Sequence, residues 1–161
     1  DGALPHEIDS ALEDYGFPMG LFAVYDMAGL EIAWARRKRQ AATRDAAERY
    51  VEIADHLCEA GRLGRKAGRG WYAYPGGDRQ VDPEVTEIIV QCRARKGITP
   101  RSFTKDEIIE RLLSAMFDEG CKLLAEGIAA RESDIDLVMV NGYGFPAHKG
   151  GPMFAAAQTP R

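Results

Sequence analysis

Apolar side chains recur every three to four residues along most of this chain, and glycine and proline interrupt the pattern at several places. This spacing puts the apolar residues of each segment on one face of a helix. The sequence therefore predicts an all-α protein built from amphipathic helices. The predicted helices cover residues 4–15, 20–40 with a break near Gly29, 44–60, 82–96, 104–128 and 133–142.

Two of these helices carry clear start signals. Asp82 stands directly before Pro83, which is the arrangement of an N-terminal cap followed by proline in the first turn. Thr104 and Glu107 have the spacing of a capping box, in which side chain and backbone bond each other reciprocally. We therefore expect helices to begin at these two points.

The helix predicted over 104–128 is unusually long and carries one apolar stripe from Ile108 to Ile128. A stripe of this length needs a large partner surface to cover it. Ser133 and Asp136 are predicted to cap the short helix that follows.

One region departs from the helical pattern. Residues 61–70 contain four glycines and four cations, and the aromatic stretch 71–74 follows directly. Alternating large aromatics bounded by glycine are typical of a short strand or an extended segment. We expect a short extended aromatic segment at this place in an otherwise helical fold.

A repeated corner is the most informative feature of the sequence. Tyr-Gly-Phe-Pro occurs at 15–18 and again at 143–146, each time after a short predicted helix that begins with Ile-Asp. A matching tetrapeptide with matching flanks indicates a duplicated helical unit. We therefore predict two tandem units, at 1–97 and 98–161, related by an internal repeat. The first unit lacks the long helix that precedes the corner in the second.

Charge and composition exclude several functions. The formal net charge of −4 argues against a broad nucleic-acid surface, and no apolar run approaches the roughly 20 residues that span a bilayer. The first residue is not methionine, which favours a piece of a longer protein. Three cysteines without close spacing are interpreted as reduced thiols in a protein core, typical of an intracellular protein, cytoplasmic if bacterial.

Three stretches of the sequence resemble the C-terminal domain of the 3-hydroxyacyl-CoA dehydrogenase family. They are residues 15–30, 61–72 and 126–153, which together span nearly the whole chain. Two corners in tandem are most similar to the multifunctional fatty-acid oxidation enzymes, which fuse an enoyl-CoA hydratase region to the dehydrogenase. The chain departs from the family pattern at Leu21, where proline is usual, and in the tail 155–161.

The resemblance implies an oxidoreductase of fatty-acid beta-oxidation that passes hydride between an acyl-CoA and NAD. It places NAD and the catalytic His–Glu pair in a nucleotide-binding half outside this sequence, so no catalytic, cofactor-binding or metal-binding residue is expected here. It also implies that the second unit mimics the partner of a dimeric relative. The chain alone is therefore expected to be inactive, and its uncovered apolar surface predicts self-association.

Two residues are candidates for contact with the acyl-CoA substrate. The resemblance associates the position before the second corner with substrate, which falls on Asn141 or on Tyr143. An amide and a phenol can hydrogen-bond a thioester or a CoA amide. The alternative for Asn141 is a helix C-terminus, and for both corners a purely structural role. The basic residues Arg65, Lys66 and Arg69 are interpreted as a surface loop in preference to a phosphate site.

Two other functions remain open from the sequence. The chain could be a self-standing helical interaction module without an enzymatic connection. It could also be the C-terminal domain of another nucleotide-dependent dehydrogenase, for example one that acts on sugars or hydroxy acids.

Overall fold

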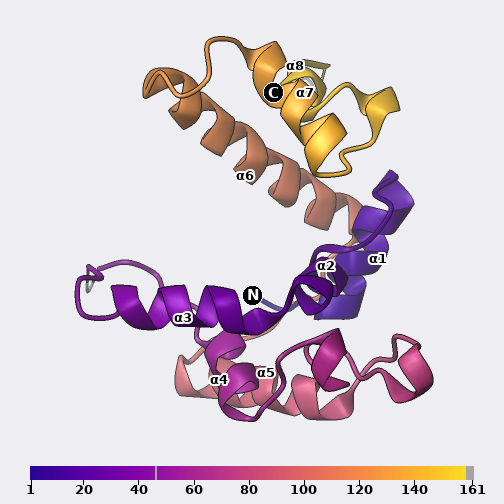
Figure 1. Cartoon of the computed structure of the whole chain (residues 1–161), viewed down its shortest axis with the longest axis vertical. Helices are drawn as coiled ribbons and strands as arrows, with labels where there is room; N and C mark the ends of the chain where they lie inside the picture. The colour runs from indigo at the N-terminus through magenta and orange to yellow at the C-terminus, as the bar shows by residue number, and fades with distance from the viewer. Residues whose placement is uncertain (46, 159–161) are drawn as a thin grey trace. The chain divides into compact units, whose positions relative to one another are not determined.

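The computed structural model describes residues 1–45 and 47–158, and these residues form helices without any β-strand (Figure 1). The all-α prediction is therefore confirmed. The helices are α1 (Pro5–Tyr15), α2 (Leu21–Ala28), α3 (Leu30–Gln40), α4 (Ile53–Glu59), α5 (Pro83–Arg95), α6 (Lys105–Ala125), α7 (Glu132–Gly142) and α8 (Pro152–Gln158). Three short 3-10 turns join them: η1 (Arg65–Ala67), η2 (Pro75–Gly77) and η3 (Ala147–Lys149).

Contacts divide the chain into two compact units. The first comprises residues 1–6 and 21–102, and the second comprises 7–20 and 103–161. The first corner therefore belongs to the same compact unit as the second corner, although more than a hundred residues separate them in sequence. The predicted repeat units, 1–97 and 98–161, describe a duplication in the sequence. Compact units are defined by packing and need not be contiguous, so the predicted repeat stays a prediction.

The first unit is built on contacts of α4 with α3 and with α5, and of α2 with η1. Its core includes Leu57, Tyr72, Val85 and Ile89, which are almost completely buried. Asp82 caps α5 by accepting a hydrogen bond from the Glu84 amide at 3.0 Å, and Pro83 occupies the first turn, as predicted.

The second unit is organised around α6, which contacts both α7 and α8 (Figure 1). Thr104 and Glu107 form the predicted capping box at its start. Gly120 of α6 is buried against Met153 of α8, so the absence of a side chain lets the two helices approach closely. Part of the long stripe on α6 is thus covered within this unit.

The segment predicted as a helix over 44–60 is helical only from Ile53 to Glu59. The prediction is wrong for the described residues of 44–52, because polar contacts hold their backbone in a non-helical conformation. The Arg44 guanidinium lies 3.5 Å from the centre of the Tyr50 ring and donates to the Arg37 carbonyl at 3.2 Å. The Tyr50 hydroxyl in turn donates to Asp55. Ala46 lies outside the described residues.

Two smaller expectations also need correction. The helix α7 begins at Glu132 after Arg131, without a side-chain cap from Ser133 or Asp136. Cys58 and Cys92 are buried as expected, but Cys121 is exposed. The end of the divergent tail, residues 159–161, lies outside the described residues, whereas 152–158 form α8.

In the described part of the chain, no helix combines the length and apolar character needed to cross a membrane.

Candidate functional site

The two Tyr-Gly-Phe-Pro corners meet in the second unit. The Phe17 and Phe145 rings lie edge to face with centroids 5.3 Å apart, and Tyr15 meets Phe145 at 6.2 Å in the same manner. Phe145 is only 2% exposed, so it is the centre of this cluster. Burial raises the pKa of the Tyr15 phenol above its usual range. The corners therefore share one apolar cluster.

The contacts between the corners are reciprocal. A Cβ placed on Gly16 would lie 3.2 Å from the Pro146 ring, and one placed on Gly144 would lie 3.1 Å from the Pro18 ring. Each glycine has a positive φ, a backbone angle that residues with a side chain rarely adopt. The glycine of each corner thus packs on the proline of the other. Such an exchange of partners is the pattern of a two-fold interface between identical surfaces.

A buried aspartate supports each corner from the helix before it. Asp9 is 1% exposed and Asp136 is 9% exposed. Asp9 lies directly against Gly20, at the start of α2, and Asp136 lies against Gly151, at the start of α8. The Asp136 carboxylate accepts hydrogen bonds from the amides of Met153 at 2.8 Å and Phe154 at 3.1 Å, so Asp136 caps α8 instead of its own helix.

The predicted substrate residues Asn141 and Tyr143 lie together at the end of α7. The Asn141 amide nitrogen donates to the Leu137 carbonyl one turn earlier at 2.8 Å, and the Tyr143 side chain is 71% exposed. This bond uses one of the two N–H groups of the Asn141 amide, and the amide oxygen can still accept a hydrogen bond. Both residues therefore present polar atoms on the surface next to the second corner.

A pocket of about 800 Å³ opens in the second unit, among α1, α6 and α8. Tyr15, Ile109, Leu113 and Phe117 supply apolar lining, and Lys149 lies 5.0 Å above the Tyr15 ring. Other charged lining residues are Asp14, Lys105, Asp106 and Glu110. Asn141 and Tyr143 are not among the lining residues. The pocket combines an apolar wall with a charged rim, which suits an amphipathic ligand or an apolar segment of a partner.

The glycine-rich segment 61–70 and the aromatic stretch 71–74 that follows it pack around one buried carboxylate. Asp26, 1% exposed, accepts hydrogen bonds from the Trp71 amide at 2.8 Å, the Tyr72 amide at 2.9 Å and the Tyr74 hydroxyl at 3.0 Å. Burial raises the pKa of Asp26, although these hydrogen bonds act in the opposite direction. The aromatic segment predicted as a short strand or extended stretch forms bends and isolated bridges, not a strand. The Asp26 carboxylate satisfies two of its amides, which a neighbouring strand would otherwise bond.

One cation of this segment is fully buried. Arg62 donates to the Gly70 carbonyl at 2.9 Å, to Asp82 at 2.6 Å and to Glu84 at 2.8 Å. No role was assigned to Arg62 from the sequence, where only Arg65, Lys66 and Arg69 were interpreted as a surface loop. Arg65 and Lys66 are exposed, and Arg69 is exposed and donates to the Ala60 carbonyl at 3.2 Å.

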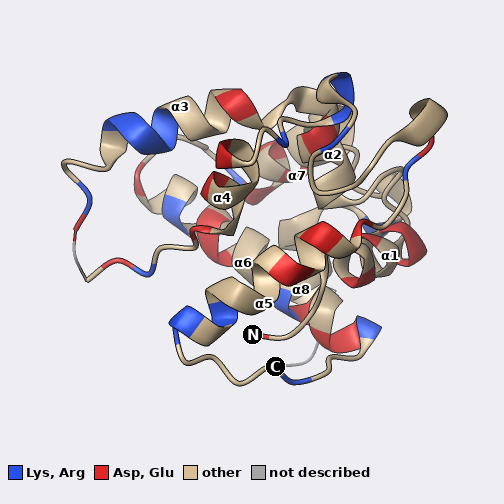
Figure 2. Cartoon of the chain, turned by 90° about the horizontal axis from the view of Figure 1, so that it is seen from below, with Lys and Arg blue, Asp and Glu red and all other residues tan. Residues whose placement is uncertain are grey.

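The basic end of α3 is a second cationic surface of the first unit (Figure 2). Arg37 forms an ion pair with Asp55 at 2.7 Å, and the Lys38 ammonium lies 3.6 Å above the Trp34 ring. These partners belong to the same unit, so the basic residues have a structural explanation. Positive charge is favoured at the C-terminal end of a helix dipole, and the Arg37–Asp55 ion pair joins α3 to α4.

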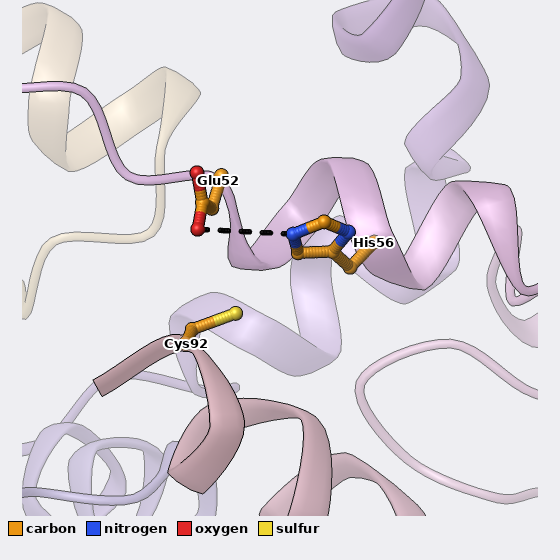
Figure 3. A group of neighbouring side chains, drawn as sticks. All are labelled: Glu52, His56 and Cys92. Carbon is orange, nitrogen blue, oxygen red and sulfur yellow. Dashed lines mark ion pairs between the residues drawn. The ribbon is translucent and has the colours of Figure 1, made fainter. Parts of the chain in front are cut away.

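The histidines lie in different surroundings. His148 is exposed, and its ring lies against Gly16. His56 has close carboxylate neighbours, Glu59 at 2.9 Å and Glu52 at 3.8 Å, and with Glu52 and Cys92 it forms a group of metal-ligating side chains (Figure 3). Sequence reasoning expected no metal ligands here. The four-residue spacing of Glu52 and His56 was visible, but Cys92 is distant in sequence and only the packing of α4 on α5 brings it near.

The described residues do not fit a dinucleotide. Binding of NAD on a nucleotide fold needs a glycine-rich turn between a strand and a helix. The described part of this chain has isolated bridges but no strand, and its glycine-rich segment is wrapped around Asp26 and Arg62. No hydride-transfer step can therefore be assigned to these residues.

Two solved dehydrogenase structures share this helical fold. A solved structure of the dehydrogenase part of multifunctional enzyme 1 from C. elegans has a TM-score of 0.69 and 27% identity, covering 93% of this chain and 33% of that one. 3-Hydroxybutyryl-CoA dehydrogenase from Escherichia coli shares the fold, with a TM-score of 0.65 and 19% identity over 97% of this chain and 48% of that one.

The chain belongs to the family "3-hydroxyacyl-CoA dehydrogenase, C-terminal domain", which matches residues 1–74 and 108–153. The peroxisomal bifunctional enzyme of Danio rerio is 44% identical over 99% of this chain and 24% of its own length. The human enzyme of that name is 42% identical over 98% of this chain and 24% of its length. This chain thus spans about a quarter of the length of these relatives.

Proposed function

We propose that this chain forms the substrate-cleft wall and the dimer-like packing region of an NAD-dependent 3-hydroxyacyl-CoA dehydrogenase. The match of one dehydrogenase family to residues 1–74 and 108–153 carries this proposal. NAD binds to a nucleotide-binding half, and acyl-CoA lies between that half and this region. The relatives named above are bifunctional or multifunctional enzymes, which supports a fused enoyl-CoA hydratase region. Peroxisomal and glyoxysomal names among relatives support an intracellular location.

The duplication of the helical unit is part of the proposal. Each stretch matched by the family contains one corner. The reciprocal Gly16–Pro146 and Gly144–Pro18 contacts are what two subunits related by a two-fold axis would make. The second repeat, residues 98–161, thereby takes the place that a second subunit occupies in a dimer, and its Phe145 covers apolar surface around Phe17 of the first repeat.

The test is a chimera in which this chain replaces the aligned quarter of the Danio rerio enzyme. We expect the chimera to form NADH from a 3-hydroxyacyl-CoA and NAD, while this chain alone forms none. A folded chimera without activity would contradict the assignment to a dehydrogenase. Activity of this chain alone would contradict the placement of the chemistry elsewhere. Binding of sugar nucleotides in preference to CoA esters would favour another dehydrogenase class.

The substrate role of Asn141 and Tyr143 is tested in the same chimera. Replacing Tyr143 by Phe or Asn141 by Ala removes one hydrogen-bonding group, worth about 1 kcal/mol, so we expect kcat/KM to fall about fivefold. Tyr25→Phe, an exposed tyrosine of the first unit, is the matched control and should leave kcat/KM unchanged. Equal values for all three variants would assign Asn141 and Tyr143 a structural role only.

A further inference from the structure

Three metal-ligating side chains converge in the first unit, apart from the corners and the pocket. Glu52 stands directly before α4, His56 lies one turn later on α4, and Cys92 lies on α5. One ligand atom from each lies within 4.8 Å of the other two. Figure 3 shows the Cys92 sulfur directed toward the space beside the paired Glu52 and His56. Oxygen, nitrogen and sulfur donors therefore face one small volume.

The imidazole of His56 is oriented for ligation by a carboxylate on its other side. Its Nδ1 lies 2.9 Å from Glu59 Oε2, a distance at which Nδ1 carries the proton and donates. The lone pair is then on Nε2, which faces Glu52 Oε1 at 3.8 Å. A carboxylate that holds the distal nitrogen of a ligating histidine is a regular feature of metal sites, because it fixes the tautomer and raises ligand basicity.

A positive group already lies among these three donors. Arg95 Nη2 is 2.8 Å from His56 Nε2, 3.2 Å from Cys92 Sγ and 3.6 Å from Glu52 Oε1. All three donors thus direct electron density at one cation. The Arg95 side chain is 54% exposed, so it can turn into solvent, and exposed ion pairs of this kind contribute little stability.

We propose that Glu52, His56 and Cys92 bind one zinc-type divalent ion, which displaces the Arg95 guanidinium. This mixed donor set suits zinc and cobalt, and the two negative charges of carboxylate and thiolate balance the ion. Tetrahedral ligands at zinc distances lie about 3.3–3.8 Å apart, close to the present Glu52–His56 separation. The Cys92 thiol releases its proton on binding, and a water molecule completes the coordination.

Binding would connect parts of the first unit that the chain joins only through long segments. Glu52 ends the segment that follows α3, whereas Cys92 lies in the last turn of α5. An ion held by both therefore ties that segment and α4 to α5. Because the ion binds the folded site and not the dispersed ligands, it should stabilise this unit against unfolding. This inference is independent of the proposed dehydrogenase role.

The test is a titration of the metal-free full chain with Co²⁺, followed by the thiolate-to-cobalt charge-transfer absorption. We expect one equivalent to bind, Zn²⁺ to abolish the absorption, and the thermal unfolding midpoint to rise with either ion. Cys92→Ser should lose the absorption, and His56→Gln should weaken binding at least tenfold. Cys121→Ser and His148→Gln are the matched controls and should bind as the unsubstituted chain does.

Two further variants separate this site from adventitious thiol binding. Glu59→Gln should weaken Co²⁺ binding about tenfold through the orientation of His56. Arg95→Ala should tighten it, because the competing cation is gone. His56 is about one-third exposed, so its variant should fold, which circular dichroism verifies. No absorption in the unsubstituted chain, unchanged affinity in His56→Gln, or weaker binding in Arg95→Ala would each overturn the proposal.

Discussion

Phe17 and Phe145 meet edge to face at a centroid distance of 5.3 Å, although more than 120 residues separate them in the chain. Each belongs to a corner whose glycine packs on the proline of the other corner. Edge-to-face aromatic pairs add about 0.5–1.5 kcal/mol to the free energy gained from burial alone. The second unit should therefore depend strongly on this cluster.

Truncation of Phe145 tests that dependence. Phe145→Ala removes a ring that is 2% exposed, and we expect the free energy of unfolding to fall by about 3–5 kcal/mol. Phe154→Ala removes the same side chain from a position that is 53% exposed in the same unit and should cost less than about 1 kcal/mol. Urea unfolding followed by circular dichroism measures both. Similar losses would show that the corners do not form the core of this unit.

The ion pair of Asp82 with buried Arg62 should make stability depend on pH. Burial opposes ionisation of Asp82, but the Arg62 hydrogen bond, the Glu84 amide and nearby positive charge hold its pKa below the ordinary value. A lowered pKa contributes stability above the unfolded value of about 3.9, and this contribution is lost as pH falls through the folded pKa.

Asp82→Asn isolates this charge, because asparagine caps a helix about as well as aspartate does. We expect the variant to be about 1–3 kcal/mol less stable at neutral pH, since Arg62 loses a charged partner in a buried place. The difference should shrink in acid, below the ordinary carboxyl range. Urea unfolding across pH measures it, and a loss that does not change with pH would contradict the electrostatic explanation.

Alanine substitutions at two helical glycines should change stability in opposite directions. A Cβ on Gly120 would lie 2.4 Å from the Met153 sulfur, so Gly120→Ala should destabilise the chain by about 1–3 kcal/mol despite its better helix propensity. A Cβ on Gly142, at the end of α7, meets nothing within 4 Å, and Gly142→Ala should stabilise by about 0.5 kcal/mol. Thermal unfolding ranks the two, and the reverse order would show that α6 and α8 pack loosely.

The exposed apolar side chains of α2 and α3 predict self-association of the isolated chain. Val24 is 39% exposed, Tyr25 47% and Ile32 72%, all in the first unit. Val24→Lys combined with Ile32→Lys should reduce the mean mass measured by light scattering at high protein concentration. Leu137→Lys, at an exposed position of α7, is the control and should leave association unchanged. A monomeric mass for the unsubstituted chain would contradict the prediction.

Local signals in the sequence were sufficient for many elements of the fold. The Asp82 cap and the Thr104–Glu107 capping box depend on residues within one turn, so their spacing alone predicted where α5 and α6 begin. The repeated corner was also visible as a tetrapeptide. Its reciprocal packing could be expected only by analogy with paired subunits.

Features that depend on distant residues were not predictable in this way. The segment before α4 has a helical pattern, but stacking of Arg44 on Tyr50 competes with the helix. The carboxylate of Asp26 accepts hydrogen bonds from the Trp71 and Tyr72 amides, 45 and 46 residues later in the chain. No local sequence pattern predicts such a distant partner. The candidate metal ligands were missed for the same reason, since Cys92 reaches His56 only through packing of α4 on α5.

The buried guanidinium of Arg62 has a consequence for how this region opens. It donates hydrogen bonds to the Gly70 carbonyl and to the carboxylates of Asp82 and Glu84. Release of the glycine-rich loop would therefore leave a charge without its partners in the protein interior. The loop and the first turn of α5 should then open as one cooperative event. Hydrogen exchange at the Trp71 and Tyr72 amides would accordingly follow the same opening free energy as that turn.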